Sequence, residues 1–140
     1  MQLTDRVKYC NGCSACVVPC KTSCIKMADG KPVINEDGCS KCNACTLFCP
    51  VFNPVDVPAF EEWYEFSQEC YDRVDPKYYR EIMRKARSGE HTEFVGTLCQ
   101  IAGLISLQGG VVAHNLILKP MICDAEKREQ REACQHCIFY

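Results

Sequence analysis

The stretch from Cys10 to Pro50 contains the same spacing of cysteines twice, with the two copies 29 residues apart. They read Cys10-Asn-Gly-Cys13-Ser-Ala-Cys16-Val-Val-Pro-Cys20 and Cys39-Ser-Lys-Cys42-Asn-Ala-Cys45-Thr-Leu-Phe-Cys49-Pro50. Both copies follow the pattern C-x2-C-x2-C-x3-C, and most residues between the cysteines are small or polar. Three thiols spaced in this way can surround one metal centre from a single tight loop. The repeat therefore predicts a fold that is organised around metal–thiolate sites.

The rest of the composition favours metal or redox chemistry over a disulfide scaffold. The chain has 140 residues, of which 14 are Cys, and a formal net charge of −2. This balance excludes a generally basic nucleic-acid-binding protein. The N-terminal residues lack the apolar segment of a secretory signal, and the most apolar stretch, Phe94–Leu107, is too short to cross a bilayer. We therefore expect a cytoplasmic protein without a membrane span, whose cysteines serve metal or redox chemistry.

The spacing suits a cubane iron–sulfur cluster, in which each of four irons takes one thiolate. Three cysteines of a motif can bind three corners from one loop. The fourth follows after three more residues and starts a short helix that leads away from the loop, so it is better placed to reach the other cluster. Zinc is the alternative, but zinc sites usually combine two C-x2-C pairs across a longer gap. A zinc site would have no use for the third cysteine of each triplet.

With this doubled motif, residues 8–52 resemble a bacterial-type 2×4Fe–4S ferredoxin domain, in which the motifs exchange their fourth cysteine. The resemblance implies two 4Fe–4S clusters as cofactors. The ligands of the first cluster would be Cys10, Cys13, Cys16 and Cys49. The ligands of the second cluster would be Cys39, Cys42, Cys45 and Cys20. One alternative stays open, because Cys20 lacks the following proline of the family and Cys24 lies only four residues beyond it. Cys24 could replace Cys20 as a ligand.

A proline-containing connector, residues 53–58, divides the chain, since each proline favours extended backbone before it. Residues 1–52 carry six basic and four acidic side chains, whereas residues 53–140 carry ten and fourteen. We expect a 2×4Fe–4S ferredoxin domain over residues 1–52 and a mostly helical docking or extension region over residues 53–140. Within the first domain, alternating runs on either side of Asp29-Gly30 predict a β-hairpin over residues 25–34.

Helical periodicity predicts four helices in the extension and leaves one probable strand. The expected helices cover residues 58–73, 75–87, 92–108 and 124–137. The second of them begins with Asp75 as N-cap and Pro76 in its first turn. The strand is expected over residues 111–118, after a Gly-Gly pair that ends the third helix. The fold class that follows is α+β, with short β-hairpins and helices in the first domain and a mainly helical C-terminal extension.

The order of these pieces is similar to that of a larger family. A two-cluster unit, a connector and a helix that ends in Gly-Gly-Val-Val resemble the N-terminal part of the β-subunit family of deazaflavin-reducing hydrogenases and dehydrogenases. In that family the helix and strand open a flavin-binding domain. The resemblance is weaker than the first one, and it assigns no flavin-binding residue to this chain. It implies either common ancestry with that family or a partnership with a flavin-containing oxidoreductase.

Five cysteines lie outside the repeats, namely Cys70, Cys99, Cys123, Cys134 and Cys137. The last two form a C-x2-C pair, which by itself is weak evidence for a metal site. These five residues are therefore not assigned as ligands, and a third metal site stays an alternative. We expect His91 in a loop and His114 in a strand, and neither as a catalyst.

The sequence assigns no catalytic residue, because no nucleophile–base arrangement or phosphate-binding loop stands out in it. Two clusters in one small domain accept and pass electrons singly. We expect an electron-transfer subunit of a larger anaerobic oxidoreductase, bound in a hetero-oligomer to redox partner proteins that contain flavin or metal, without nucleic acid. A free diffusing ferredoxin and a redox- or iron-responsive sensor are the alternatives.

Overall fold

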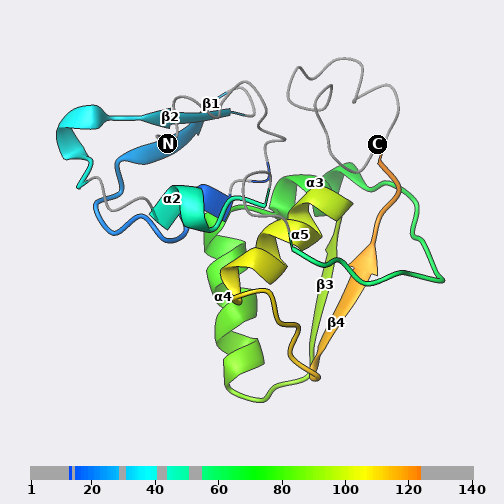
Figure 1. The fold of residues 1–140 in the computed structure, drawn as a ribbon. Coiled ribbons are helices and arrows are strands. Elements are labelled where there is room, and N and C mark those ends of the chain that lie inside the picture. Colours follow the sequence, from blue (N-terminus) through cyan, green and yellow to red (C-terminus); the bar gives the residue numbers. More distant parts are fainter. Residues whose placement is uncertain (1–12, 14, 29–30, 41–43, 51–54, 124–140) are drawn as a thin grey trace.

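The hairpin predicted between the two cysteine motifs is present. The computed structural model describes residues 13, 15–28, 31–40, 44–50 and 55–123. Strands β1 (Ile25–Ala28) and β2 (Lys31–Ile34) pair antiparallel, with Ile25 opposite Ile34 (Figure 1). Three short helical segments flank the hairpin, namely η2 (Ala15–Val17), η3 (Glu36–Gly38) and α2 (Ala44–Leu47). The cysteine-rich stretch therefore consists of short elements around one small sheet.

The helix expected over residues 75–87 is confirmed as α4 (Pro76–Arg87). Asp75 is its N-cap, and its carboxylate accepts a hydrogen bond of 2.7 Å from the backbone N–H of Tyr78. Proline at the first helical position has no N–H that would be left without a partner. The helix buries one face, formed by Tyr79, Ile82, Met83 and Ala86.

The helix expected over residues 58–73 is wrong for most of its length. Only α3 (Gln68–Arg73) is helical, and residues 55–67 contain neither a helix nor a named strand. Tyr64 forms an isolated parallel bridge with Met121. Its N–H donates to the carbonyl of Pro120 at 2.9 Å, and its carbonyl accepts from Ile122 at 2.8 Å. These long-range hydrogen bonds fix an extended backbone, so they override the helical spacing of the aromatic residues.

The helix expected over residues 92–108 is also wrong in its first turns. Residues Thr92–Gly96 form strand β3, and only Leu98–Leu107 form helix α5. The expected strand begins later than predicted, as β4 (Leu116–Pro120), and pairs parallel with β3. The extension therefore contains a β–α–β unit with two strands instead of one. The final predicted helix, over residues 124–137, lies outside the described residues.

The boundary between β3 and α5 has a local cause. Burial alternates along the strand, with Phe94 buried and Glu93 exposed, which is the two-residue period of a strand with one covered face. Thr97 and Gln100 then form a capping box that starts the helix. The N–H of Thr97 donates to the Gln100 side chain at 3.0 Å. A short strand and a capped helix thus occupy a stretch whose apolar residues also fit one continuous helix.

Helix α5 is the centre of the molecule, since every residue from Cys99 to Leu107 is buried. It contacts both η2 and β3, and Figure 1 shows the hairpin and the β3–β4 pair on opposite sides of the helices in this view. Cys13 and Ala15 belong to the same hydrophobic core as Tyr79 and Leu104. The cysteine-rich stretch and the extension therefore share one core. The chain is a mixed α and β protein, compatible with the α+β class.

Candidate metal centre

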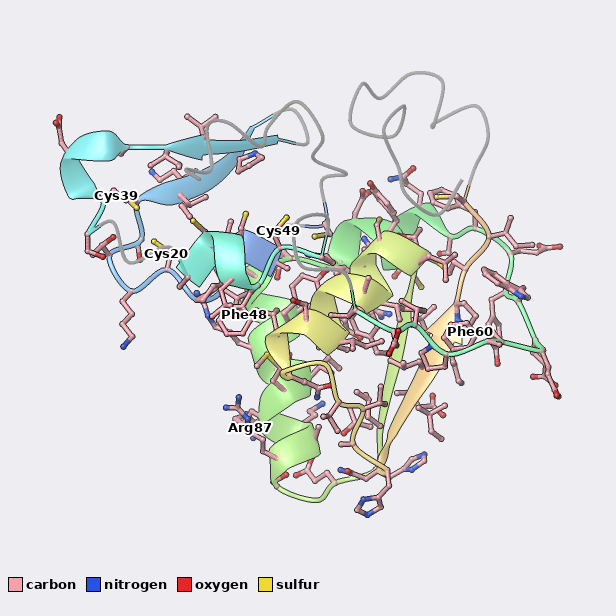
Figure 2. All side chains as sticks on the ribbon, in the orientation of Figure 1. Cys20, Cys39, Phe48, Cys49, Phe60 and Arg87 are labelled. Atoms are coloured by element: carbon pink, nitrogen blue, oxygen red, sulfur yellow. The ribbon has the colours of Figure 1, made fainter. Side chains whose placement is uncertain are left out.

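Four thiols line one recess beside the hairpin. Cys20 comes from the turn after η2, Cys24 from the residue before β1, Cys39 from the loop after η3 and Cys45 from α2. The other lining residues are small, polar or aliphatic, namely Lys21, Thr22, Ile25, Ile34, Ser40 and Ala44. Figure 2 labels Cys20 and Cys39 on the two loops that face each other there. Three of these cysteines belong to the predicted second ligand set, whose remaining member, Cys42, lies outside the described residues.

The sulfur atoms of Cys20 and Cys24 are 3.4 Å apart. Burial opposes ionisation of Cys20, but hydrogen bonds from Thr22 and Cys24 outweigh it and lower the pKa of the Cys20 thiol to about 7. For Cys24, the hydrogen bond with Thr22 lowers the pKa, whereas burial and the Cys20 and Cys39 thiols raise it above its ordinary value. The pair therefore contains one thiol that ionises near neutral pH, and a thiolate is the form that binds metal.

The first predicted ligand set lies closer to the helices. Cys13 and Cys16 are buried, Cys49 is half-buried, and Cys10 lies outside the described residues. Cys13 packs into the main core, whereas Cys16 packs with Cys24 and Ile25 in a second, smaller hydrophobic cluster. Because Cys16 is only three residues from Cys13, the short η2 segment connects the main core to the wall of the recess.

The donors at the recess are thiols, which are the ligands of iron–sulfur clusters. Within the described ranges, no three His, Cys, Asp or Glu side chains are grouped to hold one ion. The thiols line the recess from separate segments. A cubane cluster requires this arrangement, because each thiolate binds a different iron. The residues present at the recess therefore fit the predicted cofactor.

Side chains from the extension donate hydrogen bonds to the backbone next to the first ligand set. The hydroxyl of Tyr79 donates to the carbonyl of Cys13 at 2.8 Å and to that of Gln100 at 3.3 Å. Ser106 donates to the carbonyl of Phe48 at 2.8 Å, and Figure 2 shows Phe48 beside the helices of the extension. These contacts cannot be predicted from the sequence, in which Tyr79 only contributes to the helical spacing of apolar residues over residues 75–87. No local sequence pattern predicts a hydrogen bond between residues that are 66 positions apart.

Tyr79 is fully buried, and burial raises its pKa well above the ordinary value, with a further contribution from the nearby thiols. Those thiols belong to Cys13, Cys99 and Cys16. The phenol consequently keeps its proton throughout the physiological pH range. It acts as a permanent hydrogen-bond donor to the loop that carries Cys13.

The late cysteines are dispersed among the described residues. The Cys99 sulfur lies 3.1 Å from the hydroxyl of Thr97, and the Arg73 guanidinium donates to the Cys70 sulfur at 3.7 Å. The described late cysteines, Cys70, Cys99 and Cys123, form no group of three ligands with one another. Cys134 and Cys137 lie outside the described residues. His91 is in a loop as expected, whereas His114 is in the turn before β4 and not in the strand.

The extension also forms an open groove of about 400 Å³ near the start of α5. Its walls are residues 55–60, Trp63 and Leu98. Trp63 is 42% exposed and makes an edge-on contact with Phe60, with their ring centroids 6.1 Å apart. The groove therefore presents an aromatic side chain at the surface of an acidic segment.

None of the helices in the described ranges is long and apolar enough to span a membrane. Comparison of the chain with protein-family models, with curated proteins and with solved structures finds no match. The functional interpretation therefore rests on the cysteine spacing and on the geometry of the recess.

Proposed function

We propose that this chain is an electron-transfer iron–sulfur protein, in which two 4Fe–4S clusters carry single electrons between partner proteins. The observation that carries the proposal is the recess, where four thiols from separate segments meet. A bound 4Fe–4S cluster supplies one-electron redox chemistry at a potential that its surroundings set. The cysteines that would hold the first cluster are Cys10, Cys13, Cys16 and Cys49. Those that would hold the second are Cys39, Cys42, Cys45 and Cys20.

The protein's own contribution is to position and shield the thiolates. The hairpin holds Cys24 and Ile25 in place, since Asn35 donates to the Cys24 carbonyl at 2.8 Å. Burial keeps water away from the thiolates, and backbone dipoles near them adjust the reduction potential. The exposed side chain of Lys21 at the edge of the recess provides positive charge, which favours a reduced cluster.

We further propose that the chain acts as a cytoplasmic subunit of a larger anaerobic oxidoreductase. The groove at Trp63 supports this part of the proposal, because exposed aromatic residues are frequent anchors at protein interfaces. Size-exclusion chromatography of the native protein from anaerobic extracts tests it. Elution with a flavin- or metal-containing partner is expected, and elution at the monomer mass would favour a freely diffusing ferredoxin.

The test of the cofactor is the amount of iron and acid-labile sulfide per chain, measured on protein purified without oxygen. We expect about eight irons and about eight sulfides per chain. Dithionite reduction should produce an electron paramagnetic resonance (EPR) spectrum broadened by interaction between two reduced clusters. One zinc per chain and no labile sulfide would refute the proposal. About four irons would show that only one motif binds a cluster.

A redox-responsive sensor is the second candidate, and the short distance between the Cys20 and Cys24 sulfurs favours it. In cluster-free protein, a small-molecule disulfide would oxidise both thiols to an intramolecular disulfide and leave as two thiols. Peptide mass spectrometry before and after dithiothreitol would detect a reversible bond between these residues. If the cluster content of the protein does not change when this disulfide forms and is reduced, the sensor candidate is wrong.

A further inference from the structure

Three side chains of the extension donate hydrogen bonds to backbone carbonyls of the cysteine-rich stretch. Tyr79 donates to Cys13, 66 residues away, at 2.8 Å. Arg80 donates to Val18 at 3.3 Å across 62 residues, and Ser106 donates to Phe48 at 2.8 Å across 58 residues. A backbone carbonyl needs such a partner when it is buried. Helices α4 and α5 thus supply hydrogen-bond donors to the cysteine-rich stretch.

The three acceptors share a position relative to the predicted ligands. Cys13 is itself a ligand of the first set, Val18 follows Cys16 by two residues, and Phe48 directly precedes Cys49. All described members of the first set therefore lie at, or within two residues of, a carbonyl that the extension holds. The hydrogen bonds fix the backbone from which these thiols project.

Gly103 of α5 completes the contact because it has no side chain. A Cβ at this position would lie 3.1 Å from the Tyr79 hydroxyl oxygen, 3.2 Å from the Ala15 Cβ and 3.4 Å from the Cys13 sulfur. Glycine at position 103 consequently allows the backbone of α5 to approach the Cys13 loop more closely than a residue with a side chain would. A close helix–loop contact of this kind leaves no space for water at the loop.

The second ligand set has a different environment. In the described part of the chain, its recess is lined by residues from Cys20 to Cys45, all from the hairpin and its flanking segments. The described ligands of this set, Cys20, Cys39 and Cys45, pack around a small hydrophobic cluster that is separate from the main core. The Arg80 bond to Val18 lies two residues from a ligand of each set, so it does not distinguish the two sites. The two sites differ in the hydroxyl donors Tyr79 and Ser106, whose acceptors are Cys13 and the residue before Cys49.

We infer that the extension is a structural part of the first cluster site, with Tyr79 and Ser106 as positioning residues for the segments that carry Cys13 and Cys49. This inference rests on the proposed function. It makes the two clusters unequal, because the hydroxyls of Tyr79 and Ser106 bind the backbone at Cys13 and next to Cys49, which are ligands of the first site. The hydroxyl protons place partial positive charge beside the first site, which stabilises its reduced form.

The experiment compares four single variants of the full chain with the parent protein, all purified without oxygen. Tyr79→Phe and Ser106→Ala each remove one donor oxygen. Tyr78→Phe and Ser88→Ala are the matched controls, since Tyr78 is the neighbouring phenol and Ser88 donates only to the Lys85 carbonyl in its own helix end. Iron content is measured first, and a redox titration followed by EPR then gives the potential of each cluster.

We expect the parent and all four variants to contain two clusters. Tyr79→Phe and Ser106→Ala should each make the same one of the two potentials more negative and leave the other unchanged, while the controls change neither. Cys13→Ser identifies the affected cluster, because an oxygen ligand must alter the potential of the cluster that it binds. Loss of one cluster only, in either donor variant, would also support the inference.

Other outcomes overturn the inference in distinguishable ways. Equal shifts of both potentials, or no shift, in the donor variants would show that the extension does not act on one site. If Tyr79→Phe does not fold, Ser106→Ala decides the question by itself. A parent protein that contains fewer than two clusters would instead refute the proposed function. The inference, which rests on that function, would then be refuted too.

Discussion

The sulfur atoms of Cys20 and Cys24 lie 3.4 Å apart, and the hydroxyl of Thr22 is 3.6 Å from the Cys20 sulfur. A turn of five residues thus places two thiols and a hydroxyl together. Ser23, inside this turn, has a φ of 55°, which is uncommon for a residue with a side chain. The turn holds Cys20 close to the partners that favour its thiolate.

The first prediction concerns the pH dependence of Cys20 in cluster-free protein. Its pKa of about 7 is lower than the ordinary value of a cysteine, so the thiolate fraction rises through pH 7 and is nearly complete by pH 9. The rate of alkylation by iodoacetamide at Cys20 should rise with the same midpoint, as followed by peptide mass spectrometry. Cys24, whose pKa is raised, should react only at higher pH.

Thr22→Val tests the cause of this shift, because it removes the hydroxyl and keeps the shape of the side chain. The alkylation midpoint of Cys20 should move to higher pH. Ser40→Ala is the control, since Ser40 lines the same recess but is not among the causes of the shift. Equal midpoints in the parent and in Thr22→Val would contradict the assignment.

The second prediction concerns Gly103. Its replacement by Ala places a Cβ 3.1 Å from the Tyr79 hydroxyl and 3.2 Å from the Ala15 Cβ, and both of these residues are fully buried. Alanine favours a helix by about 1 kcal/mol over glycine, but overpacking costs about 1–3 kcal/mol. We expect the free energy of unfolding to fall by up to about 2 kcal/mol in anaerobic urea titrations.

The control for this prediction is the double variant Gly103→Ala with Ala15→Gly, which removes one of the contacts. A double-mutant cycle should show a favourable coupling between the two substitutions. If Gly103→Ala stabilises the protein, the result contradicts the close contact between Gly103 and the Cys13 loop.

The elements that the sequence predicted correctly are stabilised by residues close to one another in the chain. Helix α4 has Asp75 as a side-chain cap, and the hairpin has alternation and a turn sequence within ten residues of chain. Strand β3 was missed, because Phe94 and Val95 fit a helix as well as a strand, and only pairing with β4 decides between them. Three thiols that the cysteine spacing assigned to one set, Cys20, Cys39 and Cys45, line the recess together with Cys24, which the spacing did not assign to that set. The Tyr79 contact depends on tertiary packing.

The third prediction concerns the cap of α4. Asp75→Ala should lower the free energy of unfolding by about 1 kcal/mol, because the Tyr78 N–H loses its acceptor. Asp75→Asn keeps an acceptor oxygen at the same place, so most of the stability should remain. Thermal unfolding followed by circular dichroism measures both. Equal losses in the two variants would mean that the carboxylate acts through its charge instead.

The fourth prediction distinguishes an extended chain from a helix over residues 58–67. The amide of Tyr64 donates to the Pro120 carbonyl, so its hydrogen exchange should be slow. Exchange at Glu61 and Glu62, which are exposed and lie outside any helix or strand, should be fast. Amide exchange measured by NMR resolves these sites. Uniform protection across the segment would restore the helix that the sequence predicted.

The contact between Tyr79 and Cys13 also has a consequence for biogenesis. The ribosome adds Tyr79 66 residues after Cys13, which takes about 3–13 s at about 5–20 residues per second. All residues that line the recess have been synthesised before Tyr79. If the proposed function is correct, a nascent chain can therefore receive its second cluster first. The contacts of Tyr79 and Ser106 with the first site would form only after α4 and α5 have been synthesised.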